Sequence, residues 1–131
     1  MHIMEQPVSE FKSSSGLKRI SSAFFHSIDG FKAAWKNEHA FRQELVLFVV
    51  GSVVALALRI SAFEKLVLIG MLVLVLIVEL INSAIEAVVD RISLERHALS
   101  KNAKDFGSAA VFLACGLAFA TWAVVLFNRF Y

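Results

Sequence analysis

The sequence predicts an all-α membrane protein in which one amphipathic surface helix precedes three transmembrane helices. Hydrophobic residues make up 58% of the 131 positions, and the mean hydropathy of +0.70 is too high for an ordinary soluble domain. Three long apolar segments are separated by polar ones, as in a multi-pass chain. The net charge of +2 gives no sign of nucleic-acid binding, and the single cysteine, Cys115, excludes a disulfide within the chain.

The N-terminal part divides into a polar tail and an amphipathic helix. Residues 1–16 are polar and contain Pro7 and the run Ser13–Gly16, so we expect a flexible tail. Over residues 17–37, apolar side chains recur at three- and four-residue steps with basic residues between them, which predicts an amphipathic helix. A soluble helix packed on a core has the same pattern, but the chain offers no soluble core. We therefore expect this helix to lie in the membrane surface.

Three apolar segments follow, and we expect transmembrane helices over residues 44–63, 65–90 and 107–127. The first is the weakest, because its uncharged run, Leu45–Leu58, has only 14 residues, whereas about 20 are needed to cross the hydrocarbon core. Either Arg59 extends to the interface or the helix begins before Glu44. The third has 21 residues without a charge. Residues 91–106, between the second and third spans, are polar and are expected to form a loop.

The distribution of basic residues predicts the orientation of the spans. Six Lys and Arg residues precede the first span and four lie in residues 91–106, whereas the turn between the first two spans has two and the C-terminal tail has one. The positive-inside rule therefore places the N-terminus and residues 91–106 on the cytoplasmic side. The C-terminus then lies on the opposite side.

The second span contains an acidic stripe, formed by Glu79, Asn82, Glu86 and Asp90. Their spacing of three, four and four residues places them on one helix face. A carboxylate in the bilayer costs roughly 2.5–3.5 kcal/mol on insertion scales. By helix rise, Glu79 lies about 10 Å below the cytoplasmic surface and Glu86 lies near the headgroups. One such residue is equally explained by helix packing, but four on one face that opens to the cytoplasm indicate a functional site.

Other acidic and basic residues suggest a phosphoryl-transfer site on that side. Glu86 and Glu38 are the type of ligand that Mg²⁺ uses, although their spacing in sequence does not show that they meet. Lys104, followed by Asp105, precedes the third span, where its charge would neutralise a transferring phosphoryl group. The same lysine is also explained as a cytoplasmic anchor of the span under the positive-inside rule. No Walker-type or kinase-type glycine loop is present in the sequence.

The sequence resembles the small integral-membrane diacylglycerol kinases of bacteria. The resemblance is carried by three stretches, Trp35–Glu44, Glu79–Arg91 and Lys104–Ala110, and it extends from about Lys18 to Phe127. It implies phosphorylation of the primary hydroxyl of diacylglycerol, with ATP as co-substrate and Mg²⁺ as cofactor, to give phosphatidate. It also implies a homotrimeric bundle in the bacterial inner membrane, with a cytoplasmic N-terminus, a periplasmic C-terminus and active sites shared between neighbouring subunits.

The resemblance further implies roles for individual residues. Glu79 would be the catalytic base, and Glu38 and Glu86 would hold the metal. The ATP-binding residues would be Arg19, Glu38, Asn82, Glu86, Asp90, Glu95, His97, Lys104 and Asp105. The lipid-binding residues would be Trp35, Ala40, Phe41, Arg42, Gln43, Glu44, Glu79 and Ser108.

Three alternative functions share some of these features. A related branch of lipid kinases phosphorylates undecaprenol and would carry a similar acidic stripe; the intact run Ala40–Glu44 and the well-developed surface helix favour diacylglycerol. A small oligomeric transporter would use Glu79 for proton coupling, but it would need its carboxylate near the midplane. A non-catalytic membrane subunit would leave the stripe and Lys104 unexplained.

Overall fold

The computed structural model describes residues 15–131, which form four α-helices and no strand. Helix α1 spans Gly16–Asn37, α2 His39–Ala57, α3 Ala62–Ile92 and α4 Ala98–Phe130. The all-helical prediction is confirmed, and α2, α3 and α4 are each long and apolar enough to cross a membrane. The predicted tail, residues 1–16, lies outside the described residues except for its last two positions.

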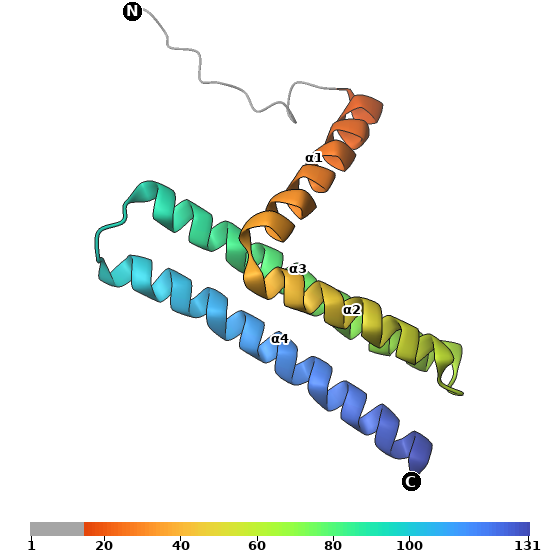
Figure 1. Ribbon diagram of the computed structural model, residues 1–131. Helices are drawn as coiled ribbons and strands as arrows, with labels where there is room; N and C mark the ends of the chain where they lie inside the picture. The colour runs from red at the N-terminus through yellow and green to blue at the C-terminus, as the bar shows by residue number, and fades with distance from the viewer. Residues whose placement is uncertain (1–14) are drawn as a thin grey trace, which may run out of the picture.

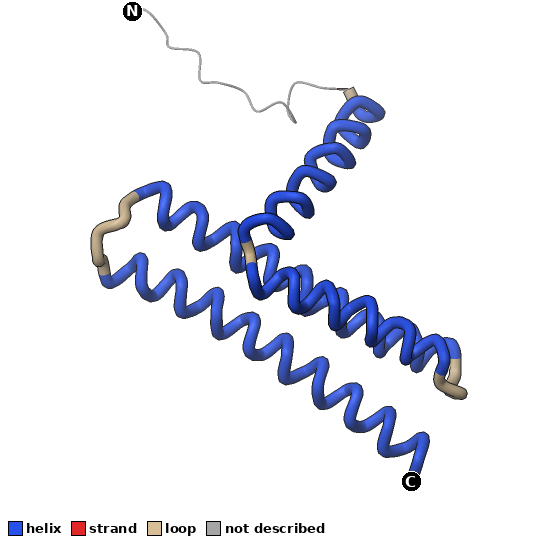
Figure 2. Tube along the Cα trace, in the orientation of Figure 1, coloured by secondary structure: helices blue, strands red, loops and turns tan. Residues whose placement is uncertain are grey.

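Helix α3 is the centre of the bundle, because it packs against α2 and against α4. The α3–α4 connection lies at one end of the bundle, and the α2–α3 turn and the C-terminus lie at the other (Figure 1). Helix α1 projects away from the bundle at a steep angle, and a single residue, Glu38, separates it from α2 (Figure 2). Glu38 has an extended backbone, with φ of −116° and ψ of 109°, which produces the sharp change of direction.

The turn between α2 and α3 shows how the short first span is built. Helix α2 begins at His39, before Glu44, and ends at Ala57, so that Arg59 lies in the turn rather than within the span expected over 44–63. Ser61 then starts α3 with a capping box, in which its Oγ accepts from the Glu64 N–H at 3.1 Å and its own N–H donates to Glu64 Oε1 at 3.1 Å. Lys65 Nζ also donates to the carbonyl of Leu56 at 2.8 Å, at the end of α2.

The connection between α3 and α4 is much shorter than the loop expected over residues 91–106. Only residues 93–97 are non-helical, because α4 already begins at Ala98. The segment 98–106 is polar but has neither glycine nor proline, and its alanines, lysines and leucine favour a helix. His97 caps the helix, since its Nδ1 accepts from the Leu99 N–H at 3.1 Å. The expected loop was therefore wrong: polarity in this segment marks a helix outside the apolar span.

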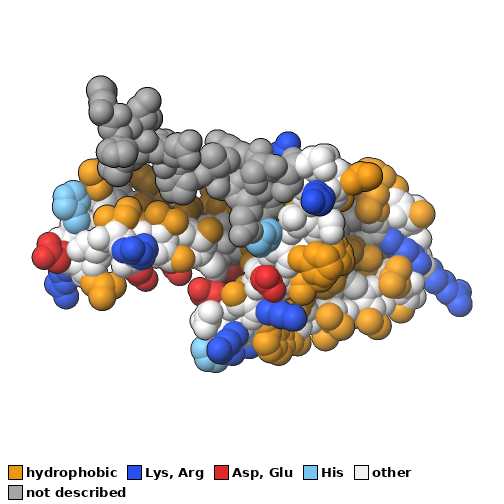
Figure 3. Space-filling view, turned by 90° about the horizontal axis from the view of Figure 1, so that it is seen from above, with side chains coloured by type: hydrophobic (Ala, Val, Ile, Leu, Met, Phe, Trp, Pro, Cys, Tyr) orange, Lys and Arg blue, Asp and Glu red, His pale blue; other side chains and the backbone are white. Residues whose placement is uncertain are grey.

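The interior of the bundle is small and mostly apolar. Val75 of α3 packs with Ala114 and Ala118 of α4, and Trp122 Nε1 of α4 donates to the Leu68 carbonyl of α3 at 3.1 Å. Large apolar side chains cover much of the outer surface, while acidic side chains gather near the middle of the view in Figure 3. An apolar exterior of this kind suits a lipid environment or contacts with further subunits.

Candidate active site

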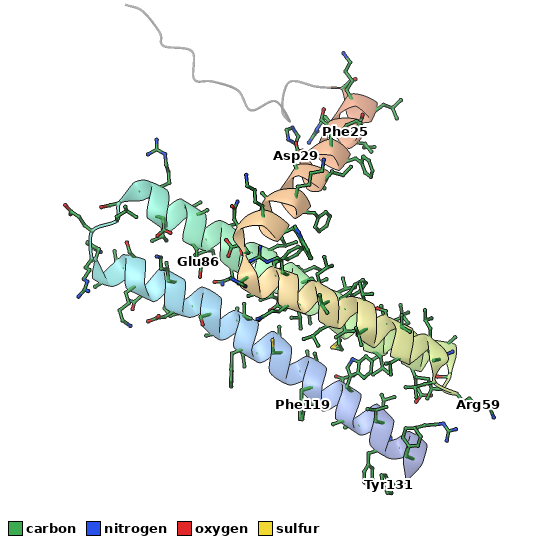
Figure 4. All side chains as sticks on the ribbon, in the orientation of Figure 1. Phe25, Asp29, Arg59, Glu86, Phe119 and Tyr131 are labelled. Atoms are coloured by element: carbon green, nitrogen blue, oxygen red, sulfur yellow. The ribbon has the colours of Figure 1, made fainter. Side chains whose placement is uncertain are left out.

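The two buried polar side chains within residues 15–131 are the first members of the acidic stripe. Glu79 is 5% exposed and Asn82 is 8% exposed, and both lie on α3. Asn82 Nδ2 donates to Glu86 Oε1 at 3.4 Å, one helical turn further along. Glu86 is half-buried and lies on the side of α3 that faces α4 (Figure 4). The stripe therefore starts inside the bundle and runs toward the α3–α4 connection.

Carboxyl groups from separate segments interact electrostatically with Glu79. Glu86 of α3 and Glu38 of the α1–α2 junction both interact electrostatically with Glu79, and so does Glu44 of α2. The fold thus brings Glu38 and Glu86, predicted as metal ligands from distant parts of the chain, to the same buried carboxyl group. Within residues 15–131 no three acidic, histidine or cysteine side chains converge as a complete metal-binding cluster. Two carboxylates fit Mg²⁺, which keeps water and phosphate oxygens as its other ligands.

A hollow of about 600 Å³ lies where α3 ends and α4 begins. Four of the predicted ATP-binding residues line it: Asp90, Glu95, His97 and Lys104. Lys104 Nζ forms an ion pair with Asp90 Oδ1 at 2.7 Å, which joins α4 to α3, and both side chains are about half exposed. The volume is within the range of small-molecule sites.

Two other predicted ATP-binding residues are placed differently. Asp105 forms an ion pair with Lys101 one turn earlier on α4, at 2.6 Å, and does not line the hollow. Arg19 lies near the start of α1, where a shallow depression is lined, among residues 15–131, by Gly16, Arg19, Ile20 and Ala23 of α1. Because α1 projects away from the bundle (Figure 1), one chain does not bring Arg19 to the hollow.

Most of the predicted lipid-binding residues lie at or near the α1–α2 junction, whereas Glu79 is on α3 and Ser108 is on α4. Phe41 is 2% exposed, and its ring stacks on that of Phe31 with centroids 6.5 Å apart. Arg42 Nη1 donates to the Trp35 carbonyl at 3.2 Å, across the junction. Oε2 of Glu44 is buried without a hydrogen-bond partner among the described residues. Ala40 is half-buried nearby, whereas Gln43 and, on α4, Ser108 are exposed.

A second hollow, of about 470 Å³, lies between α1 and α3 beside this junction. It is lined by Glu38 and Asn37 on one side and by Leu80 and Ser83 on the other. Ser83 Oγ is buried and has no hydrogen-bond partner within residues 15–131. Most of the other lining residues are apolar, namely Phe31, Ala33, Ala34, Ala84 and Ala87. The hollow is therefore mostly apolar, with a carboxylate and an unused hydroxyl group at its wall.

Several residues of these hollows were not among the predicted site residues. Arg96 and Lys101 line the first hollow, and Ser83 lines the second. A basic residue beside the predicted nucleotide residues Glu95 and His97 was a usable signal for Arg96. Ser83 follows Asn82 directly, so a second polar position in the apolar helix was a signal too.

The arrangement is suited to transfer of a charged group. A buried carboxylate, Glu79, begins a polar path that leads along α3, past Glu86, to Asp90, about 16 Å away by helix rise. Asp90 is ion-paired with Lys104 of α4. Cations at the polar end can neutralise anionic groups, whereas the buried carboxylate can accept a proton from a group that enters from the apolar side.

Known proteins match the chain along most of its length. Residues 25–126 match the family model described as prokaryotic diacylglycerol kinase. A diacylglycerol kinase of Pseudomonas aeruginosa is 55% identical over 118 residues, which is 90% of this chain and 96% of that protein. The diacylglycerol kinase of Escherichia coli K12 is 49% identical over 116 residues, 88% of this chain and 95% of its own. One from Helicobacter pylori J99 is 41% identical over 121 residues, 90% of this chain and 91% of its own.

Proposed function

The chain belongs to the prokaryotic diacylglycerol kinase family, and we propose that it transfers the terminal phosphoryl group of ATP to the primary hydroxyl group of diacylglycerol, yielding phosphatidate. Phosphorylation of diacylglycerol itself follows from the family and from the high identity over nearly the whole chain. The observation that carries the assignment of the site is Glu79, a carboxylate only 5% exposed within a candidate transmembrane helix.

Glu79 is the general base in this proposal. The reaction needs a group that takes the proton from the lipid hydroxyl as its oxygen attacks the phosphorus atom. A buried carboxylate on α3 suits a hydroxyl that arrives from the membrane, because the lipid substrate approaches it from the bilayer and not from water. Support comes from the hollow between α1 and α3, because it is lined by Glu38, whose carboxyl group interacts electrostatically with Glu79.

Glu38 and Glu86 are proposed to hold Mg²⁺. Both carboxyl groups interact with Glu79, and Asn82 orients Glu86 through the 3.4 Å hydrogen bond from its amide. When bound, the metal ion supplies positive charge that neutralises the phosphate oxygens. The residues themselves contribute fixed oxygen ligands from two separate segments, so that the phosphoryl group and the lipid hydroxyl are held near one another.

ATP is proposed to bind in the hollow at the α3–α4 connection. Lys104 lines this hollow, where its ammonium group can contact the phosphates of ATP. Its ion pair with Asp90 holds that group in position before ATP binds. Glu95 and His97, in the α3–α4 connection, line one wall of this hollow. Asp105 adds a negative charge near the start of α4. Arg19 approaches the nucleotide from α1 of a neighbouring subunit.

The lipid reaches the site along the membrane surface. Helix α1 leaves large apolar side chains exposed, including Leu17, Ile20 and Phe24, and we place this face in the bilayer interface. Trp35, Phe41 and Arg42 then lie at the junction, where a glycerol headgroup meets α3. Ala40, Gln43, Glu44 and Ser108 complete the proposed lipid contacts. We propose that the chain lies in the inner membrane with its N-terminus in the cytoplasm and its C-terminus in the periplasm, which the distribution of Lys and Arg supports.

A homotrimer completes this site. One chain leaves most of its large apolar side chains exposed, and it leaves Arg19 remote from the nucleotide hollow. A neighbouring copy can cover the exposed apolar side chains, and it can bring its own Arg19 to the nucleotide hollow. Three copies, rather than two, follow from the resemblance of the whole chain to the bacterial membrane kinases.

The decisive experiment is transfer of phosphate from ATP to a short-chain diacylglycerol in detergent micelles with Mg²⁺. Undecaprenol is assayed in parallel, and Glu79→Gln serves as the variant without the base. Loss of transfer in the variant supports both the reaction and the base. Transfer to undecaprenol alone would move the chain to the related branch. A folded, oligomeric protein that phosphorylates neither lipid would reject the kinase assignment and favour proton-coupled transport.

A further inference from the structure

Gly107 of α4 lies directly against Asn82 of α3. It is buried, and a Cβ atom added to it would overlap with Asn82 Oδ1 and lie 3.2 Å from Asn82 Cγ. Asn82 Cα is only 3.8 Å from the same point. A side chain larger than hydrogen therefore does not fit at this position unless the Asn82 amide moves.

The contact determines which way the Asn82 amide faces. The ideal Cβ replaces one of the two Cα hydrogens of glycine, so that this hydrogen points at Asn82 Oδ1, as in the weak Cα–H···O contacts between packed helices. Oδ1 is buried and has no conventional hydrogen-bond donor within residues 15–131. At the other end of the amide, Nδ2 donates to Glu86 Oε1 at 3.4 Å. Gly107 and Glu86 thus hold the amide between them.

We propose that Gly107 is a positioning residue for phosphoryl transfer, because its bare Cα seats Asn82 with the amide N–H group toward Glu86. The inference rests on the proposed function, since it assigns Gly107 to the group of side chains around Glu79 and Glu86. An added methyl group displaces Oδ1 and turns Nδ2 away from Glu86. The Glu86 carboxylate then loses the donor that orients it, while the hollows that receive nucleotide and lipid keep their walls.

The test compares Gly107→Ala with Gly116→Ala on the same helix. Gly116 is a matched control, because a Cβ atom there meets nothing within 4 Å. In the micellar assay with diacylglycerol, ATP and Mg²⁺, we expect Gly107→Ala to lower kcat about 100-fold, the scale of a 1 Å displacement near the reacting groups, with little change in KM. Gly116→Ala should behave as the parent chain.

The outcomes separate the inference from the function on which it rests. A parent chain without transfer rejects the proposed function. A parent chain that is active, together with a Gly107→Ala variant that is equally active, overturns the positioning role alone. An equal loss in Gly116→Ala assigns the effect to α4 packing in general and also overturns it.

A second comparison removes Asn82 itself. In Asn82→Ala the atoms that overlap with the new methyl group are gone, and the nearest remaining atom is the Cα at 3.8 Å, which is an ordinary contact. Adding Gly107→Ala to Asn82→Ala should therefore reduce neither kcat nor thermal stability any further. If Gly107→Ala alone does not fold, the double variant should still fold and match Asn82→Ala. A further loss in the double variant contradicts the inference.

Discussion

Glu79→Gln is expected to change activity and stability in opposite directions. Glutamine has nearly the same volume as glutamate, so the substitution leaves no cavity on α3. It removes a charge that is 5% exposed and that interacts with the carboxyl groups of Glu86, Glu38 and Glu44. The base is lost, and with it a repulsive interaction among carboxylates.

The expected magnitudes follow from these surroundings. General-base catalysis contributes typically 10²–10⁴-fold, so kcat should fall by about that factor. A carboxylate inside a membrane helix costs roughly 2.5–3.5 kcal/mol on insertion scales, and a neutral amide costs less. We therefore expect the free energy of unfolding to rise by about 1–3 kcal/mol, a gain limited by the polarity of the glutamine that remains.

Equilibrium unfolding in mixed micelles, titrated with a denaturing detergent, measures the stability, and the coupled kinase assay measures kcat. Glu95→Gln is the control, because Glu95 is exposed and its substitution should change stability by less than about 0.5 kcal/mol. A Glu79→Gln protein that is both inactive and less stable than the parent would refute the reasoning. In that case Glu79 would hold the bundle together instead of costing it stability.

Further substitutions test other parts of the structure. Ser61→Ala removes the capping box with Glu64 and should lower the free energy of unfolding by about 1 kcal/mol; kcat should be unchanged, because Ser61 lies at the opposite end of α3 from the nucleotide hollow. Lys104→Gln should lower kcat/KM for ATP by about 100-fold, as other losses of charge stabilisation do, and an unchanged value would mean that Lys104 serves only its ion pair with Asp90. Glu86→Gln should raise the Mg²⁺ concentration needed for half-maximal activity, measured by titration of the metal at saturating ATP; the same requirement in both proteins would remove Glu86 from the metal site.

The sequence was sufficient for the helices and for the face of α3 that carries the acidic stripe. Periodicity within a helix fixes which residues share a face, so Glu79, Asn82 and Glu86 were found together. Membrane length requirements gave three spans, although the start of α4 was missed because a polar helix that continues beyond the apolar span resembles a loop in composition. Polarity reports contact with water, whereas helix formation here depends on propensity and on the His97 cap.

Contacts between helices were less predictable. The approach of Gly107 to Asn82 and the ion pair of Lys104 with Asp90 depend on the rotation of α4 relative to α3. Between the two helices, Ala114 and Ala118 pack against Val75, and no periodicity within one helix reveals such a contact. The roles assigned to the individual site residues by resemblance stay predictions that the substitutions above test.

The single-residue junction between α1 and α2 has a mechanical consequence. Glu38 is the whole of that hinge, since α1 ends at Asn37 and α2 begins at His39. Any change in the tilt of α1 must therefore be absorbed by rotation about the backbone of Glu38 and of its immediate neighbours, and such rotation swings the attached carboxyl group. In the proposed arrangement, with α1 in the membrane surface, a change in the curvature or lipid composition of the bilayer would change the tilt of α1. That change of tilt would reorient the Glu38 carboxyl group, which interacts electrostatically with Glu79.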